Sequence, residues 1–224
     1  SFKHKGDDSY ILKNISLVIQ KGMSIGVVGE TGSGKSTLLD LLMCLIEPNT
    51  GVISVDNKDL TEKNKKTWQR NIAHVPQDIF LIDATIMENI AFGLPIGQID
   101  LDNVKKAASY AEIESYIEGM PLKYNSIVGE GGVKLSGGQK QRIGIARALY
   151  KGASILFLDE ATSALDNKTE KAVIKSLEST NKDLTLIMIA HRISTLQYCD
   201  SVVKLDKGNI VFIGSYEDYI SNHQ

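Results

Sequence analysis

GETGSGKST, which spans Gly29 to Thr37, is the stretch of this sequence that decides its fold. The residues before it, SIGVV (24–28), are typical of a buried strand, and the apolar spacing after it predicts a helix from about Lys35 to Ile46. A strand, a glycine-rich turn ending in Gly-Lys-Ser, and a helix form the context in which backbone N–H groups surround phosphate oxygens. The stretch therefore predicts a phosphate-binding loop, hereafter the P-loop.

Each residue type in the P-loop has an expected task. Glycines let backbone N–H groups turn toward the phosphates. Lys35 reaches the β- and γ-phosphates, Ser36 binds Mg²⁺ through its hydroxyl, and Thr37 supports the α-phosphate. Glu30 is expected to face solvent, and the loop residues predicted to contact the nucleotide are Gly29, Thr31, Gly32, Ser33, Gly34, Lys35, Ser36 and Thr37. A dinucleotide site is excluded because GSGKST lacks the third glycine of G-x-G-x-x-G.

Two adjacent acids follow a short apolar run in ILFLDE (155–160). The run reads as a buried strand, and ligand sites in open α/β sheets collect at the carboxyl ends of such strands. Asp159 is therefore predicted to hold Mg²⁺, and Glu160 to act as the general base that polarises the attacking water. A solvated surface turn would be the better interpretation of two adjacent acids without the P-loop upstream.

KLSGGQKQR (134–142) predicts a second anion-binding helix start. Ser136, Gly137 and Gly138 open the helix, so their N–H groups point at a ligand and the helix dipole favours negative charge. One ATP does not need two such sites from the same chain. A symmetric pair resolves this, because each ATP then lies between the GETGSGKST of one chain and the LSGGQ of the other.

Composition excludes several other classes. The net charge of −2 does not indicate a nucleic-acid surface, and no nucleic-acid partner is expected. Neither cysteine belongs to a C-x-x-C pair, so a metal or disulfide framework is not expected; Cys44 reads as a buried thiol, whereas Cys199 is less clear. The longest apolar stretch, 38–46, contains Asp40 and is too short to span a bilayer.

These motifs, in this order, resemble those of the ABC ATPase family over nearly the whole chain. The resemblance implies an α/β fold: a P-loop NTPase (RecA-like) core with a mainly parallel sheet, an N-terminal antiparallel β subdomain and an inserted α-helical subdomain. The chain is expected to be a single ABC ATPase domain, 1–224, with a core of about 1–77 and 152–224 and a helical subdomain of about 78–151. Strands are predicted at NISLVI (14–19) and GVISVDN (51–57), and helices at 61–70, 101–119, 136–151 and 168–179.

The resemblance also implies roles for isolated residues. Gln77 in HVPQD resembles the glutamine that contacts Mg²⁺ and the water, and His191 in IAHR resembles the histidine that contacts the γ-phosphate. Asp166 ends SALD, which resembles the loop at the dimer interface, and Gln139 completes LSGGQ. His4 stands where the family usually stacks an aromatic ring, most often Tyr, on adenine. Tyr10 lies nearby but aligns less well.

The branch of the family is indicated by VGEGG (128–132), just before LSGGQ. It resembles a segment of exporters that touches the coupling helices of the membrane domains, although a glycine-rich loop that only places the next helix would read the same. The resemblance implies hydrolysis of ATP with Mg²⁺, a second copy or a homologous ABC domain as partner, and an upstream membrane-spanning domain. The expected location is the cytoplasmic face of a membrane, within an integral membrane transporter. The alternative is a soluble ABC ATPase of DNA repair or translation.

Overall fold

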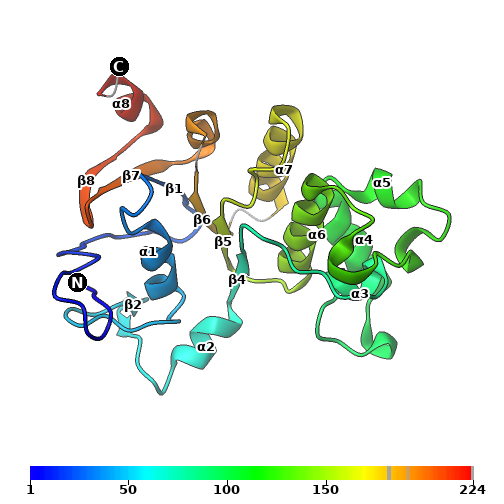
Figure 1. The fold of residues 1–224 in the computed structure, drawn as a ribbon, viewed down its shortest axis with the longest axis horizontal. Helices are drawn as coiled ribbons and strands as arrows, with labels where there is room; N and C mark the ends of the chain where they lie inside the picture. Colours follow the sequence, from blue (N-terminus) through cyan, green and yellow to red (C-terminus); the bar gives the residue numbers. More distant parts are fainter. Residues whose placement is uncertain (181–182, 191, 223–224) are drawn as a thin grey trace. The chain divides into compact units, whose positions relative to one another are not determined.

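The computed structural model describes residues 1–180, 183–190 and 192–222, and the chain divides into two compact units (Figure 1). The first unit comprises Ser1–Ile72 and Thr185–Gln224, and the second comprises Ala73–Leu184. The chain therefore leaves the first unit after Ile72 and returns to it at Thr185.

Short strands and helices alternate along the described chain. The strands are β1 (Ser24–Val28), β2 (Ser54–Val55), β3 (Lys58–Asp59), β4 (Ile72–Val75), β5 (Ile155–Asp159), β6 (Thr185–Ile189), β7 (Ser201–Asp206) and β8 (Asn209–Gly214). The helices are α1 (Lys35–Leu42), α2 (Lys65–Arg70), α3 (Ile86–Ile90), α4 (Leu101–Tyr110), α5 (Glu114–Glu118), α6 (Gly137–Tyr150), α7 (Asn167–Thr180) and α8 (Tyr216–Ser221). Single 3₁₀ turns are η1 (Ile96–Gln98), η2 (Lys123–Asn125), η3 (Glu130–Gly132) and η4 (Ile193–Tyr198).

The first unit is built on the strand order β6-β1-β7-β8. β1 pairs in parallel with β6 and with β7, and β8 returns antiparallel to β7. All five residues of β1 are buried, which is the pattern of a strand covered on both faces. η4 and α8 pack against this sheet through a small cluster of buried side chains: Val28, Leu196, Val202 and Tyr219. β1 leads directly into the P-loop, so the sheet holds the loop's first residue in place.

The antiparallel part of the first unit is smaller than the sequence suggests. Residues 14–19, predicted as a strand, are not in a strand; they alternate between half-buried and exposed, and Val18 is 84% exposed. The prediction was wrong because period-two alternation indicates an extended chain but does not supply a pairing partner. The predicted strand 51–57 is instead a hairpin of β2 and β3, turned by Asp56 and Asn57 at positive φ.

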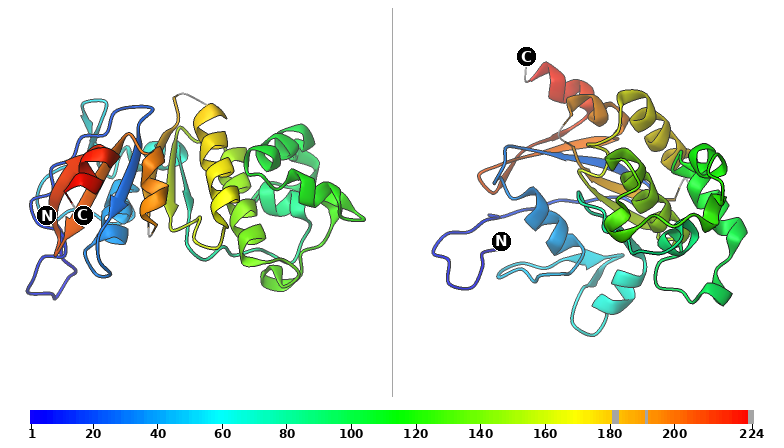
Figure 2. Two further views of the ribbon diagram at one scale, coloured as in Figure 1. Left: turned by 90° about the horizontal axis from the view of Figure 1, so that it is seen from above. Right: turned by 45° about the vertical axis from the view of Figure 1, so that its right-hand side comes forward.

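The second unit contains β4, β5 and most of the helices (Figures 1 and 2). α6 packs against α3 and α4, and its Ile143 and Ile145 are fully buried. Gly144 allows a close approach, because a Cβ there would lie 2.5 Å from Ile79 Cδ1. The predicted helical stretch 101–119 is two helices, which separate at Glu112, where φ is 55°. The predicted helical subdomain lies inside this unit, and its boundaries stay a prediction.

The fold class is confirmed: strands and helices alternate, the strands are mostly parallel, and the P-loop joins β1 to α1. The helix expected to reach Ile46 ends at Leu42, however, and Cys44 is half-buried rather than buried. Cys199 is the buried cysteine. Among the described residues, no helix combines the length and the apolar content that crossing a bilayer requires.

Candidate functional site

The P-loop has a backbone that only glycine adopts without strain. Gly29, Gly32 and Gly34 have φ of 150°, 80° and 103°. A Cβ on Gly34 would lie 2.7 Å from Leu12 Cδ2, and a Cβ on Gly29 would collide with the carbonyl oxygen of Leu205. These glycines are therefore required both by their conformation and by the close approach of neighbouring chain.

Lys35 closes the P-loop on itself. Its side chain is buried, and Nζ donates hydrogen bonds to the carbonyl oxygens of Gly29 at 2.8 Å and Glu30 at 2.9 Å. An ammonium group has three donors, so the third can donate to an oxygen of a phosphate. Ser33 Oγ is buried and has no hydrogen-bond partner among the described residues. A buried hydroxyl without a partner is costly, so a polar ligand in the loop would fit this group.

The start of α1 offers further donors to an anion. Its first turn contains no acidic residue and no side chain caps it, so the N–H groups of the first turn remain unused by the helix. Ser36 is exposed and Thr37 half-buried at this helix end, and Thr31 and Gly32 are exposed on the loop. Glu30 is also exposed, as predicted.

His4 lies on a hairpin that is attached to the P-loop. Phe2 pairs with Leu12 in an antiparallel bridge, and Leu12 is the residue that packs on Gly34. His4 is exposed, with its ring edge-on to Phe2 at a centroid distance of 5.1 Å. Tyr10 is 38% exposed, and Lys3 Nζ lies 5.7 Å from its ring centroid. Both rings are accessible, and the role of His4 stays a prediction.

In the second unit, β5 ends at the acid pair. Asp159 is half-buried, and Glu160 is half-buried with φ of 53°. A left-handed conformation is strained for a glutamate, and strain of this kind gathers at functional sites. The turn that follows is closed by hydrogen bonds from Ser163 N to Glu160 O at 3.0 Å and from Thr162 Oγ1 to the buried Glu170 at 2.6 Å. Glu160 thus stands at the start of a turn that hydrogen bonds hold closed.

The LSGGQ segment forms the capped start of α6. Ser136 Oγ accepts from Gln139 N, and Gln139 Oε1 accepts from Ser136 N at 2.8 Å, which makes a capping box. Ser136 and Gly137 are exposed. A Cβ on Gly138 would lie 3.0 Å from the carbonyl oxygen of Ala164. The predicted helix start is therefore present, with its glycines beneath the SALD segment.

Gln141 joins the two segments, and sequence reasoning did not find it. Its side chain is buried; Nε2 donates to Ser163 Oγ at 3.1 Å, and Oε1 accepts from Ala164 N at 3.0 Å. At the end of SALD, Asp166 accepts from the N–H groups of Lys168 and Thr169 at the start of α7. The hydrogen bond from Thr169 N is the main reason that the pKa of Asp166 lies below its usual range. LSGGQ and SALD thus form one hydrogen-bonded surface.

Gln77 is exposed, two residues beyond β4, at the start of a segment that runs to α3. This segment pairs with the residues around VGEGG. Val128 N donates to Ala84 O at 3.1 Å, and Ile86 N donates to Ser126 O at 3.0 Å. Gly132 packs closely against buried Leu81, because a Cβ on Gly132 would lie 2.8 Å from Leu81 Cδ1.

Arg147 and Asn89 fix the same segment, and neither was found from sequence. Arg147 donates to Phe80 O at 3.1 Å and to Asn89 O at 2.9 Å, while fully buried Asn89 donates to Ile82 O at 3.0 Å. Burial lowers the pKa of Arg147. The sequence did contain a signal for them: Arg147 is basic, Asn89 carries an amide, and both stand in mainly apolar helical segments. Such side chains need hydrogen-bond partners when they are buried.

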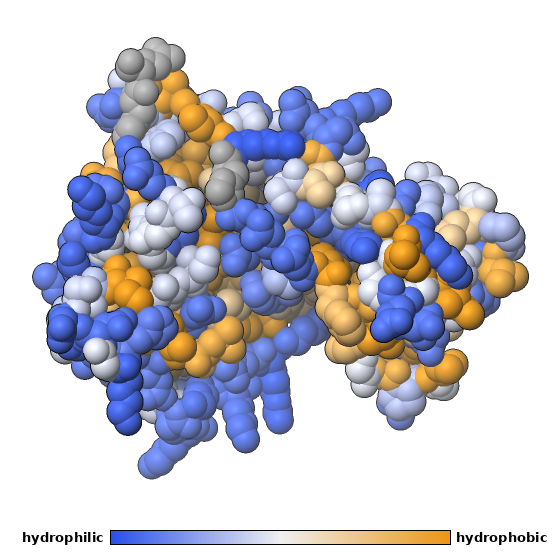
Figure 3. All heavy atoms as spheres, viewed as in Figure 1, coloured by the Kyte–Doolittle hydropathy of each residue, from blue (hydrophilic) through white to orange (hydrophobic). Residues whose placement is uncertain are grey.

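Apolar side chains remain exposed beside this network. Phe80 is 69%, Phe92 51%, Ile127 51% and Val133 75% exposed, and the Arg147 guanidinium lies 4.7 Å from the Phe92 ring centroid. Figure 3 shows apolar surface over the helices of the second unit. Exposed apolar groups that gather in one region indicate a contact surface.

The predicted site residues are divided between the two units. The first unit holds the P-loop and His4, and the second holds Gln77, the LSGGQ and SALD segments and the acid pair. His191 lies outside the described residues. The structure brings LSGGQ together with SALD in the second unit, and the His4 hairpin together with the P-loop in the first.

Comparison with known proteins gives several matches. The family model described as "ABC transporter" matches residues 12–163. The chain is 44% identical over 215 residues to human "ATP-binding cassette sub-family B member 5", which covers 96% of the chain and 17% of that protein. It is 38% identical over 223 residues to "ATP-dependent lipid A-core flippase" of Pseudomonas aeruginosa, covering all of the chain and 37% of the flippase.

A solved structure matches the whole chain as well. It is described as "Structure of a bacterial Atm1-family ABC exporter with ATP bound", and the match has a TM-score of 0.92 and 37% sequence identity. The match covers 100% of this chain and 38% of that one. The chain thus spans well under half the length of the relatives it matches.

Proposed function

The chain belongs to the ABC transporter family as its ATPase part, and from this premise we propose that it pairs face to face with a second ABC domain, binds two MgATP between them and hydrolyses them to drive export. The observation that carries the proposal is the exposed, capped start of α6. Ser136 and Gly137 are exposed there although the chain already has a P-loop. A second anion site on one chain fits an ATP that is shared by two chains.

The P-loop would hold the phosphates. Lys35 would exchange its two carbonyl partners for β- and γ-phosphate oxygens, and the unpartnered Ser33 Oγ would gain a polar neighbour. The exposed N–H groups at the start of α1 add donors with the favourable end of the helix dipole. His4, or failing it Tyr10, would stack on the adenine from the hairpin that Leu12 attaches to Gly34.

Three predicted site residues carry the oxygen ligands that Mg²⁺ prefers. Ser36, Gln77 and Asp159 would hold it together with the phosphates, since Mg²⁺ prefers one or two carboxylates with other oxygen ligands. When bound, Mg²⁺ supplies positive charge against the charge that develops on the transferred phosphoryl group. Glu160 would orient the attacking water and accept its proton. Lys35, and His191, which lies outside the described residues, would donate to the γ-phosphate oxygens.

The partner chain would complete each site. Ser136, Gly137, Gly138 and Gln139 of one chain would face the γ-phosphate held by the other, and Asp166 would lie at the interface. Because Gln141 bonds SALD to α6, both segments would reach the partner as one surface. Hydrolysis removes the γ-phosphate that joins the two chains, so the pair would reopen.

Coupling to a membrane-spanning domain accounts for the remaining features. The region 78–151 would act as a helical subdomain, and the exposed apolar side chains near VGEGG would contact cytoplasmic loops of that domain. The chain would then work on the cytoplasmic face of a membrane. Export relatives favour this reading over a soluble repair or translation ATPase.

The shared site is tested with two substitutions in combination. Glu160→Gln should lower ATP turnover by about 100-fold or more and let an ATP-bound dimer accumulate in size-exclusion chromatography with MgATP. Adding Ser136→Arg to that variant should abolish the dimer, because a large cation then occupies the γ-phosphate contact. Binding of a fluorescent ATP analogue by the monomer should stay within about twofold of wild type, since the P-loop is intact.

The control is Lys35→Ala, which should abolish nucleotide binding itself. Normal turnover in Ser136→Arg would refute the shared site. A Glu160→Gln chain that hydrolyses ATP like wild type would remove Glu160 from the role of general base.

A further inference from the structure

The C-terminal end of α1, the helix that starts at the P-loop, is closed in an unusual way. Leu45 N donates to Asp40 O at 2.9 Å and Cys44 N donates to Leu41 O at 3.0 Å. This is the Schellman pattern, in which the residue after the cap adopts a left-handed conformation. That residue is Cys44, with φ of 53°, where glycine is usual. The pattern leaves the last carbonyl groups of the turn to find partners elsewhere.

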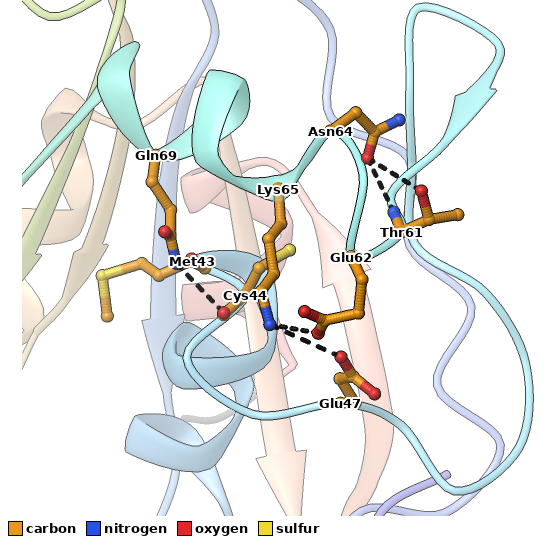
Figure 4. Close-up of polar contacts among 8 residues, drawn as sticks. All are labelled: Met43, Cys44, Glu47, Thr61, Glu62, Asn64, Lys65 and Gln69. Carbon is orange, nitrogen blue, oxygen red and sulfur yellow. Dashed lines mark hydrogen bonds and ion pairs between the residues drawn. The ribbon is translucent and has the colours of Figure 1, made fainter.

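Those partners come from α2. Trp68 Nε1 donates to Leu42 O at 2.8 Å. Gln69 Nε2 donates to Met43 O at 3.3 Å and to Cys44 O at 3.1 Å, and Figure 4 shows Gln69 beside these two residues. The Trp68 and Gln69 side chains are both half-buried. Three consecutive carbonyls are thus satisfied by two neighbouring residues of one short helix. We call Trp68 and Gln69 the α2 clamp.

Ion pairs on the outer side extend the same contact. Lys65 Nζ of α2 lies 3.8 Å from Oε1 of Glu47, a residue that follows the end of α1. The same Nζ also donates a hydrogen bond to Glu62 Oε1 (Figure 4). Both glutamates are exposed and Lys65 is half-buried, and ion pairs at the surface contribute little to stability. The specific attachment of α2 to α1 therefore rests on the clamp.

α2 lies directly before the point at which the chain leaves the first unit. α2 ends at Arg70, Ile72 is the last residue of the first unit, and the chain then continues through β4 to Gln77. The clamp thus fastens the chain to the P-loop helix immediately before it leaves the first unit. Gln77 is the residue proposed to contact Mg²⁺ and the attacking water.

We propose that Trp68 and Gln69 are positioning residues, which fasten the segment of chain that leads into β4, and so to Gln77, to the end of the P-loop helix. The proposal rests on the proposed function, because it assigns a task within the same site. The phosphate site and the clamp lie at the two ends of one short helix, Lys35–Leu42, whose backbone hydrogen bonds make it stiff. A shift of α1 on phosphate binding would therefore reach α2 through the clamp, and the chain runs on from α2 to Gln77. Without the clamp, nucleotide would still bind, but Gln77 would be misplaced for hydrolysis.

A first test uses the chain's single tryptophan, which is Trp68 itself. Saturation with MgADP should change the emission of the wild-type chain, because Trp68 bonds the end of the helix whose start binds the phosphates. Asn71→Ala is the matched control, since Asn71 lies just beyond α2 and, among the described residues, its side chain bonds Thr67 O alone. It should keep the change in emission, and Gln69→Leu should reduce it. Unchanged wild-type emission, with MgADP binding shown by calorimetry, would overturn the proposal.

A second test separates turnover from affinity. Gln69→Leu should lower kcat about fivefold, the value of one typical hydrogen bond, while KM for ATP changes by less than about twofold. Gln69→Lys, which keeps a donor, should restore most of kcat. Trp68→Phe, which keeps a ring but removes the donor, should behave like Gln69→Leu. A Gln69→Leu chain with wild-type kcat, or one that loses only affinity, would refute the role.

The two proposals fail in different ways. A wild-type chain that neither binds nor hydrolyses MgATP contradicts the proposed function. A wild-type chain that is active, and whose Gln69→Leu variant is equally active, contradicts the clamp alone. Thermal unfolding of each variant shows that it is folded before its kinetics are compared.

Discussion

Gly34 shows how far a single residue determines the P-loop. Its φ of 103° and the Leu12 contact leave no room for a side chain. Gly34→Ala should lower the free energy of unfolding by about 1–2 kcal/mol and weaken ATP binding, because the N–H groups of the loop lose their alignment. Urea denaturation and titration with a fluorescent ATP analogue measure the two effects.

Gly32 provides the comparison. Its φ is also positive, 80°, but a Cβ there would meet nothing within 4 Å. Gly32→Ala should therefore carry the backbone strain without the collision, and be the milder of the two. Equal losses for both variants would show that the contact with Leu12 is unimportant.

At the scale of an element, α7 depends on its first residues. Asp166 caps it by accepting from Lys168 N and Thr169 N, and its Oδ2 accepts from Thr169 Oγ1 at 2.7 Å. The pKa of Asp166 is lowered in the folded chain. A lowered folded pKa means that this cap stabilises the fold above the unfolded pKa, and that the stabilisation is lost as pH falls through the folded pKa.

Asp166→Ala should accordingly lower the thermal midpoint at about pH 7, and the gap to wild type should shrink as pH falls below about 4. Asp166→Asn is the matched control. Asparagine caps as well as aspartate but does not titrate, so this variant should keep its midpoint near that of wild type at neutral pH and lack the acid-dependent loss. A constant gap between wild type and Asp166→Ala at every pH would contradict the prediction.

Prediction from sequence succeeded where one element carries its own signal. The P-loop, β5 and the start of α6 are local patterns of apolar runs, glycines and a capping residue, and the structure contains all three. Prediction failed where the conformation of a segment depends on another part of the chain. The extended residues 14–19 lack a paired strand, and α1 ends at Leu42 because Cys44 turns left-handed.

Side chains that join distant elements were missed for the same reason. Gln141, Arg147 and Gln69 bond backbone groups far from them in sequence. Nothing in their neighbours indicates which carbonyl or N–H they will meet, because that depends on packing. The local conformation of these segments could thus be predicted, whereas the side chains that join them could not, and the roles of the site residues stay a prediction.

On the scale of the whole molecule, the exposed apolar side chains of the second unit leave much of their surface outside its core. Phe80→Ser should change the free energy of unfolding by less than about 0.5 kcal/mol, because the ring is 69% exposed and the contact with Arg147 uses the backbone carbonyl. ATP binding by the chain should be unaffected. Under the proposed coupling to a membrane-spanning domain, transport by the full-length protein should fall.

Substrate-stimulated ATP hydrolysis in reconstituted vesicles measures this loss. The matched variant is Val211→Ser, also exposed but on β8 of the first unit, which should leave stimulation intact. Full stimulation in Phe80→Ser would place the contact elsewhere.

The resting position of Lys35 has a consequence for which nucleotides the chain would retain. Its ammonium already has two good acceptors, Gly29 O and Glu30 O, so a ligand that leaves them in place meets only its third donor, and a stronger contact requires replacing them. Triphosphate and diphosphate tails can do so with oxygens of higher charge, whereas a monophosphate tail ends short of the lysine. AMP and adenosine would therefore be weak competitors of ATP, whereas ADP, whose diphosphate tail reaches the lysine, would compete with it.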